Sequence, residues 1–336
     1  MKRILVILVA TAVFVAVPAF AQREFKVTDR VKLGGEGFWD YLTYDDEGQR
    51  LFITRGTHVV VVDTKTLKVA GDIPDLAAIH GVALAPEFNR GFISNGGNST
   101  VTVFDLKTLA KLDSVKVGER PDAILFDPYS KHVFSFNARG QDSTVIDAAT
   151  SKMLGSIPFG SRPEFAVSDL KGKLYLTLEE KGQIAVIDVN KQSVLNNWPT
   201  APCEGPSAMA FDIEHHRLFT GCDKKMMAVM DSDSGRVIAT VPIGEGVDAA
   251  RFNPKTNEIF MSCGEGVLTI IHEDTPDRYT VRQNLPTAKG ARTMALDQKK
   301  DVAYLVTAQR EDKPVPPGQR PPLVPGSFEL LVVKAE

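Results

Sequence analysis

Polar and ionisable residues recur at intervals of 40 to 44 residues along the chain. Each stands at or just before the start of a short apolar run, so a repeating fold would bring them to one face. Carboxylates and an imidazole that converge in this way could bind a divalent cation through hard oxygen and nitrogen ligands. The series consists of Asp40, His80, Asp122, Glu164, Ser207, Asp248 and Arg292.

A second series stands at the end of the following apolar run, three residues after an aromatic side chain, and is expected on the same face. Its members are Arg55, Asn95, Asn137, Leu178, Cys222, Cys263 and Thr307. If the repeats form a ring around a central channel, nine members of the two series are expected to line a ligand site at its mouth: Asp40, His80, Asp122, Glu164, Asp248, Arg292, Arg55, Asn95 and Asn137. The candidate metal ligands are Asp122, Glu164, Asp248 and His80. The alternative is structural: the Asp side chains bond turn amides or the neighbouring repeat, and Arg292 neutralises Asp40.

The segments that must position these residues repeat with the same period. Apolar runs end in Asp at intervals of 41 to 43 residues, at Asp63, Asp105, Asp147, Asp188 and Asp231. A preceding short run carries one aromatic per period, at Phe52, Phe92, Phe134, Tyr175, Phe219, Phe260 and Tyr304. A period near 42 residues that holds several short β runs and no helical pattern predicts a four-stranded β-propeller blade.

The length of the chain and its two ends predict seven blades and a way to close the ring. The last repeat has one apolar run after Tyr304, at residues 328–333, and lacks an outermost strand. The strand-like segment 25–33 belongs to no repeat of its own. Because an open sheet edge leaves backbone groups unpaired, we expect this segment to complete the seventh blade.

The N-terminus predicts export of a mildly acidic protein. Lys2 and Arg3 precede an apolar stretch at residues 4–17, and Ala19 and Ala21 form a small-x-small cleavage signature. Residues 1–21 are therefore interpreted as a signal peptide, with 22–336 as a single propeller domain in the periplasm or outside the cell. The formal net charge of the 336 residues is -3, which argues against a general nucleic-acid binder. No membrane span is expected after removal of the signal.

The repeats resemble those of the YVTN-repeat β-propeller family, and in particular its exported YncE-like members. The resemblance rests on Arg120-Pro121-Asp122 and on the segments 126–128, 157–160, 203–206, 218–222, 241–244, 290–297 and 325–328. It covers nearly the whole mature chain and implies a propeller fold and export, with no catalytic motif to carry over. Some family members bind single-stranded DNA, but the acidic charge and the single Trp of the repeats, Trp198, argue against that activity.

Export permits disulfides, and all three cysteines fall on the face of the polar series. Pairing of strands around the turn at residues 213–216 sets Ser207 opposite Cys222, which brings Cys203 of the incoming loop within reach. We expect a Cys203–Cys222 disulfide and a free thiol at Cys263. That thiol could be a soft metal ligand or a nucleophile, and the commoner alternative is an inert buried side chain.

Two other segments offer candidate functions. The Pro-rich stretch 310–326 cannot form a helix or a central strand, and we expect it to join the second and third strands of blade seven on the face of the polar series. It is interpreted as a stiff lid or docking segment, or else as a tolerated surface loop. His215 and His216 fall in a turn on the opposite face, where histidines are usually solvated.

The leading functional interpretation is an exported, monomeric binding module that takes a small ligand or an envelope protein through its loop face and channel mouth. A divalent metal ion is the one cofactor considered. The alternative is a metal-dependent propeller enzyme of the lactonase, lyase or dehydrogenase type that uses the acidic ring. A structural scaffold for an envelope complex is a third interpretation. The chain carries no phosphate-binding loop, nucleophile elbow or metalloprotease signature.

Overall fold

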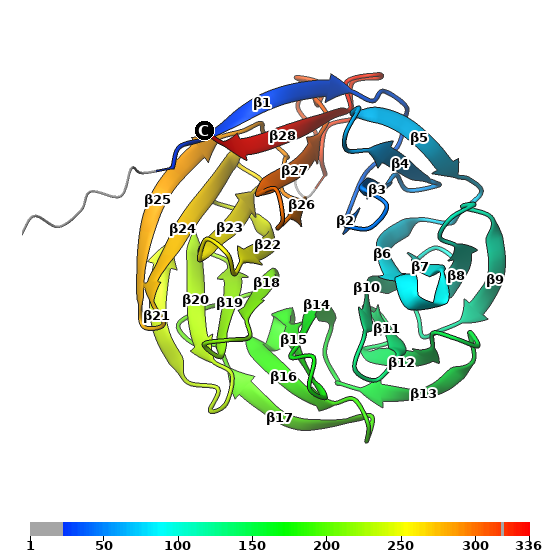
Figure 1. Cartoon of the computed structure of the whole chain (residues 1–336), viewed down its shortest axis with the longest axis vertical. Helices are drawn as coiled ribbons and strands as arrows, with labels where there is room; N and C mark the ends of the chain where they lie inside the picture. The colour runs from blue at the N-terminus through cyan, green and yellow to red at the C-terminus, as the bar shows by residue number, and fades with distance from the viewer. Residues whose placement is uncertain (1–22, 317–318) are drawn as a thin grey trace, which may run out of the picture.

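The computed structural model describes residues 23–316 and 319–336. The predicted signal peptide, residues 1–21, lies outside the described residues. Seven four-stranded antiparallel sheets are arranged in a ring (Figure 1). Their inner strands line a cavity along the axis of the ring, which we call the central channel. This arrangement confirms the predicted seven-bladed β-propeller.

In blades 1 to 6 the four strands follow one another in sequence from the channel to the rim. Blade 1 contains β2 (Leu42–Asp45), β3 (Arg50–Thr54), β4 (Val59–Asp63) and β5 (Lys68–Ile73). Blade 2 contains β6 (Ile79–Ala85), β7 (Arg90–Asn95), β8 (Thr100–Asp105) and β9 (Lys111–Lys116). Blade 3 contains β10 (Pro121–Asp127), β11 (His132–Asn137), β12 (Asp142–Asp147) and β13 (Met153–Pro158).

The next three blades repeat this order. Blade 4 contains β14 (Pro163–Ser168), β15 (Lys173–Leu178), β16 (Gln183–Asp188) and β17 (Ser193–Pro199). Blade 5 contains β18 (Met209–Asp212), β19 (Arg217–Cys222), β20 (Met226–Asp231) and β21 (Val237–Pro242). Blade 6 contains β22 (Val247–Asn253), β23 (Glu258–Cys263), β24 (Val267–Thr275) and β25 (Arg278–Pro286). Two short 3-10 helices, η1 (Pro86–Phe88) and η2 (Glu179–Lys181), occupy turns of blades 2 and 4.

The seventh blade joins the two ends of the chain, as predicted. Its inner strands are β26 (Met294–Asp297), β27 (Val302–Thr307) and β28 (Glu329–Ala335), and its outermost strand is β1 (Phe25–Lys32). β1 pairs antiparallel with β28 from Phe25 opposite Ala335 to Lys32 opposite Glu329, at the rim in Figure 1. The pairing satisfies the backbone groups that an open β28 edge would expose.

The hydrophobic core lies between neighbouring blades. The seven periodic aromatic residues of the second strands, which the repeat singled out, are all at most 2% exposed. Phe52 of blade 1, for example, packs against Phe104 of blade 2 with ring centroids 5.8 Å apart. Burial of one large side chain per blade explains why the aromatic period persists along the chain.

The periodic Asp residues have a local structural role. The Oδ1 atom of Asp63 accepts hydrogen bonds from the backbone N–H of Lys65 (3.0 Å) and Thr66 (2.7 Å) in the turn between β4 and β5. The same turn follows Asp105, Asp147, Asp188 and Asp231. These bonds lower the pKa of the Asp63 carboxyl, so each carboxylate stabilises the turn from third to fourth strand.

Candidate binding site at the channel mouth

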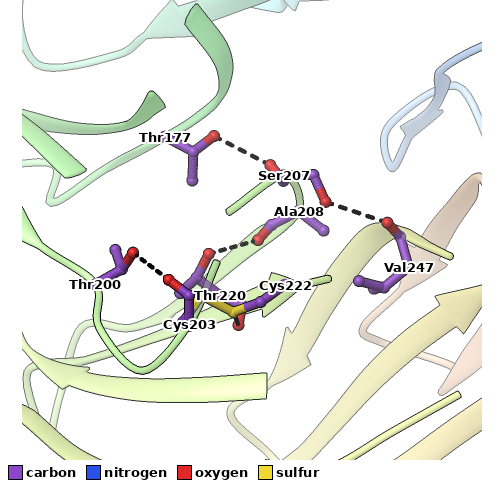
Figure 2. Close-up of a disulfide and its surroundings, with 8 residues drawn as sticks. All are labelled: Thr177, Thr200, Cys203, Ser207, Ala208, Thr220, Cys222 and Val247. Carbon is purple, nitrogen blue, oxygen red and sulfur yellow. Dashed lines mark hydrogen bonds between the residues drawn. A yellow bond between two sulfur atoms is a disulfide. The ribbon is translucent and has the colours of Figure 1, made fainter. Parts of the chain in front are cut away.

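The first polar series lies where the inner strands begin, and the preceding blade holds its backbone in place. The hydroxyl of Thr54 donates a hydrogen bond to the carbonyl of His80 at 2.9 Å. Thr177 does the same for the carbonyl of Ser207 at 3.1 Å, and the Ser207 hydroxyl donates to the carbonyl of Val247 (Figure 2). Two more bonds of this kind run from Ser94 to Asp122 and from Ser262 to Arg292. Buried hydroxyls of blades 1, 2, 4 and 6 thus each fix the backbone of a first-series residue in the next blade.

Three members of the series form one compact group. The Nδ1 atom of His80 lies 2.7 Å from Oδ2 of Asp40 and 3.4 Å from Oδ1 of Asp122. The three residues belong to blades 1, 2 and 3, and their potential ligand atoms all lie within 4.8 Å of one another. Burial disfavours the imidazolium, but the hydrogen bond with Asp40 and the charge of Asp122 raise the pKa of His80 above its ordinary value. We call this group the Asp-His-Asp cluster.

Glu164 lies beside the cluster and pairs with an arginine that the sequence interpretation missed. Its Oε2 is 3.0 Å from Nη2 of Arg162, which also lies 3.9 Å from Asp122. The Nη1 atom of Arg162 is 3.2 Å from Glu179. The Glu164–Arg162 contact has ion-pair distance without hydrogen-bond geometry, so Oε2 of Glu164 is buried with no hydrogen-bond partner among the described residues. Burial and the nearby Asp122 charge raise the pKa of Glu164 to about 8.

Asp248 and Arg292 form a second ion pair of the mouth, with 3.1 Å between Oδ2 and Nε. This geometry corrects the expectation that Arg292 neutralises Asp40, which bonds His80 instead. Burial raises the pKa of Asp248 to about 6 against the opposing charges of Arg292 and Arg320. Arg320 belongs to the Pro-rich segment, which joins β27 and β28 as expected.

The expected metal ligands are therefore divided between two settings. His80 and Asp122 lie in the Asp-His-Asp cluster, with Asp40 as the third member. Glu164 and Asp248 lie outside that cluster and are ion-paired with Arg162 and Arg292. The cluster offers one nitrogen and carboxylate oxygens, a donor set that suits Zn²⁺, Mn²⁺ or a similar divalent ion.

The polar members of the second series bond their own blades or the loops beside them. The guanidinium of Arg55 lies 3.6 Å from the centroid of the Phe328 ring and donates to the carbonyls of Gly34 and Glu36. Asn95 donates to the hydroxyl of Thr102. Asn137 donates to the hydroxyl of Thr144 and to the carboxylate of Asp142. All three side chains are buried. Their contacts stabilise loops and strand ends beneath the mouth.

The cysteines pair as expected from the strand register. Cys203 and Cys222 form a disulfide next to the Thr177–Ser207 hydrogen bond, with Cα atoms 5.5 Å apart (Figure 2). Cys263 is free and fully buried, and burial raises the pKa of its thiol to about 12. A thiol with this pKa stays protonated near neutral pH, which favours the inert alternative over a nucleophile.

The sequence interpretation also missed two aromatic residues that cross the channel. Tyr41 of blade 1 and Phe165 of blade 4 have ring centroids 5.8 Å apart, and the Tyr41 hydroxyl lies 3.4 Å from the carbonyl oxygen of Glu164. Burial and the carboxylates of the mouth raise the pKa of Tyr41 well above its ordinary value. The sequence does distinguish these two residues. Tyr41 and Phe165 directly follow members of the first series, whereas the equivalent position in the other five blades holds a small residue. The five small residues are Gly81, Ala123, Ala208, Ala249 and Thr293.

A second group of ionisable side chains includes His215, which lies in the turn between β18 and β19 with its side chain 36% exposed. Its Nδ1 atom lies 2.5 Å from Asp212 and 3.9 Å from Glu273, and both carboxylates are about 2% exposed. Burial and the charge of Asp212 raise the pKa of Glu273 to about 7. His216 instead pairs with the exposed Asp233.

Comparison with known proteins shows the fold and no family. No family model matches the chain, and no curated protein matches its sequence. Among solved structures, a chain of the mitotic checkpoint complex superposes with a TM-score of 0.76 at 13% identity, over 99% of this chain and 98% of that chain. The WD40 repeats of RRP9 give 0.76 at 10% identity, over 93% and 100%. Hydrazine synthase from Kuenenia stuttgartiensis gives 0.69 at 18% identity, over 79% and 91%.

All three similarities lie at 18% identity or below, and they show the propeller fold alone. Within the part of the chain that the structure describes, no helix is long and apolar enough to cross a membrane.

Proposed function

We propose that this protein is an exported binding module of the YVTN-repeat, YncE-like type that takes a cationic ligand, foremost a divalent metal ion, at the channel mouth. Export is supported by the signal-like pattern of residues 1–21 and by the Cys203–Cys222 disulfide. The family assignment rests on the repeat motifs of the sequence. The loop face around the mouth is the surface on which a partner from the cell envelope would dock.

The observation that carries this proposal is the Asp-His-Asp cluster. Three potential ligand atoms from three successive blades lie within 4.8 Å of one another, at the mouth of the channel. Close by, burial raises the pKa of Glu164 and of Asp248, so these carboxyls resist ionisation without additional positive charge. A bound cation would relieve that cost, because opposite charge favours the ionised form.

Elemental analysis of the protein purified without chelator tests the proposal. The wild type is expected to carry a stoichiometric divalent ion that is lost in the isosteric double variant Asp40→Asn, Asp122→Asn. A matched control, Asp113→Asn with Glu204→Gln, makes the same charge change at exposed positions and should retain the ion. Two results would contradict a metal site. One is a wild-type protein that holds no ion after supplementation with Zn²⁺, Mn²⁺ and Ca²⁺. The other is equal metal occupancy in the two double variants.

A metal-dependent enzyme is the second candidate, and the Glu164 carboxyl is the observation that favours it. A buried carboxyl with a pKa of about 8, flanked by Arg162, could exchange a proton near neutral pH, as a general acid or base must. Metal-dependent turnover of a lactone panel that disappears in Glu164→Gln would support this candidate. Turnover that persists unchanged in that variant would exclude Glu164 as the acid or base.

A further inference from the structure

The channel continues beyond Tyr41 and Phe165 as a cavity of about 530 Å³. Its lining comes from the inner strands, and the apolar side chains among them include Tyr44, Phe126 and Phe211. The lining also includes turn residues that follow the inner strands, such as Pro128 and Gln298, on the side away from the Asp-His-Asp cluster. This volume falls in the range of about 300 to 1,000 Å³ that is usual for small-molecule sites.

One cation, Arg251 of β22, lies in the wall of this cavity. Its Nη1 group donates to the carbonyl of Ala250 at 2.7 Å, and its guanidinium carbon lies 5.5 Å from the centroid of the Phe165 ring. Across residues 23–316 and 319–336, no carboxylate oxygen lies within 4 Å of the Arg251 nitrogens. By contrast, Arg162 and Arg292 at the mouth are both paired.

The Arg251 side chain is half-buried in the wall of the cavity. Burial lowers the pKa of its guanidinium to about 10, opposed by the nearby Tyr41 hydroxyl. Partial desolvation of a cation that has no anionic partner is unfavourable in a largely apolar surrounding. The cost is removed when an anion enters the cavity and pairs with it.

The carboxylates at the far ends of the inner strands already have partners. Asp297 accepts a hydrogen bond from the Tyr44 hydroxyl at 2.7 Å and two from turn amides. Asp127 accepts one from the Ser168 hydroxyl at 2.6 Å. The Gln298 side chain donates to the carbonyl of Phe252. Arg251 is therefore the charged group that the cavity offers to a ligand.

We propose that this cavity binds a small organic monocarboxylate whose body is aromatic or alicyclic. The carboxylate pairs with the guanidinium of Arg251, whose planar fork suits bidentate binding. The body of the ligand packs against the ring side chains of the wall. Tyr41 and Phe165 lie between this site and the mouth, and the two sites favour ligands of opposite charge. The inference is independent of the cation proposed for the mouth.

Naphthoate is a suitable probe, with uncharged naphthamide as its matched analogue. Isothermal titration calorimetry on the mature wild-type protein is expected to show saturable binding of naphthoate, and binding of naphthamide at least about tenfold weaker. Arg251→Met should weaken naphthoate by a similar factor and leave naphthamide unaffected. Arg278→Met, which removes an exposed arginine of β25, should change neither. A second variant, Val167→Trp, fills the cavity while Arg251 remains, and should block both ligands.

Three results would overturn the proposal. The wild type could bind naphthoate and naphthamide equally well, or the wild type and Arg251→Met could bind naphthoate equally well. The third is a dissociation constant of the wild type for naphthoate above about 1 mM. If Arg251→Met does not fold, the acid-to-amide ratio and Val167→Trp decide the question alone. Binding that survives in Val167→Trp would place the carboxylate elsewhere. Loss of the mouth metal in Asp40→Asn, Asp122→Asn should leave naphthoate binding intact, so the two proposals can fail separately.

Discussion

Tyr41 and Phe165 meet across the central channel although they belong to blades 1 and 4, which are not neighbours in the ring. Their ring centroids are 5.8 Å apart, and the Tyr41 hydroxyl reaches the carbonyl oxygen of Glu164. The pair separates the charged mouth from the aromatic cavity. It also couples the two halves of a ring whose other contacts run mainly between adjacent blades.

Tyr41→Ala is expected to destabilise the protein by about 2 to 4 kcal/mol, because it removes a large packed side chain from the middle of the ring. Equilibrium unfolding in guanidinium chloride measures the change. Tyr129→Ala, at a residue 50% exposed, is the control and should cost less than about 0.5 kcal/mol. Equal stability of the two variants would show that the cross-channel contact contributes little.

The stability of the fold should depend on pH through Glu164. Its pKa in the folded protein, about 8, is above its ordinary value of 4.5, so the native state binds the proton more tightly than the unfolded state. Its contribution to stability is complete below about pH 4.5 and is lost as the pH rises through about 8. Denaturation at a series of pH values measures the free energy of unfolding across this window. Its decrease with rising pH should be smaller in Glu164→Gln than in the wild type. Identical pH profiles would contradict the raised pKa.

Thr177→Val should destabilise the protein by about 1 to 3 kcal/mol, since the hydroxyl that it removes serves two blades. That hydroxyl accepts from the backbone N–H of Phe165 at 2.9 Å and donates to the carbonyl of Ser207 at 3.1 Å (Figure 2). Valine has the same shape but leaves both groups unpaired. Thr28→Val, at an exposed position of β1, makes the same chemical change and should have almost no effect in thermal unfolding.

Closure of the ring should depend on Phe25 in β1. This residue is 1% exposed, and its ring packs edge-on against Phe260 at 5.3 Å. Phe25→Ala is expected to lower the free energy of unfolding by about 3 to 5 kcal/mol, because it removes a large buried side chain. It should also increase hydrogen exchange of the β28 amides, because β1 covers the edge of that strand. Lys26→Ala, at the next and exposed position, is the control. Protection of β28 that is unchanged in Phe25→Ala would show that β1 stays docked without its anchor.

The disulfide should contribute about 3 kcal/mol to the free energy of unfolding, as expected for a bond between cysteines 19 residues apart in the sequence. Double substitution of Cys203 and Cys222 by Ala should lower the unfolding midpoint by a corresponding amount. Thiol titration supplies an independent check: the native protein should show no reactive thiol, and the denatured protein should show the single thiol of Cys263. Reaction of Cys263 in the native state would contradict its burial.

The sequence alone determined the number of blades, the strand order, the closing strand and the disulfide. The number of blades and the strand order follow from local patterns that recur with a fixed period: the aromatic at Phe52 and its equivalents fills the space between blades, and the Asp at Asp63 and its equivalents stabilises a turn. The closing strand follows from the incomplete last repeat, and the disulfide follows from strand pairing around the turn at residues 213–216. Because every blade has the same construction, aligning the repeats also placed Asp40, His80 and Asp122 at equivalent positions of adjacent blades, where they could meet.

Only the tertiary structure decided which charges pair and what fills the channel. Arg292 of blade 7 has two neighbouring carboxylates, Asp248 in blade 6 and Asp40 in blade 1. Alignment of the repeats shows which blades are adjacent, but it does not show towards which neighbour a side chain points. Arg55, Asn95 and Asn137 occupy equivalent positions, yet their side chains turn to local backbone and hydroxyl groups, because buried polar groups must be satisfied where they lie. The contact between Tyr41 and Phe165 joins blades that no periodic pattern relates, since it depends on the diameter of the closed ring.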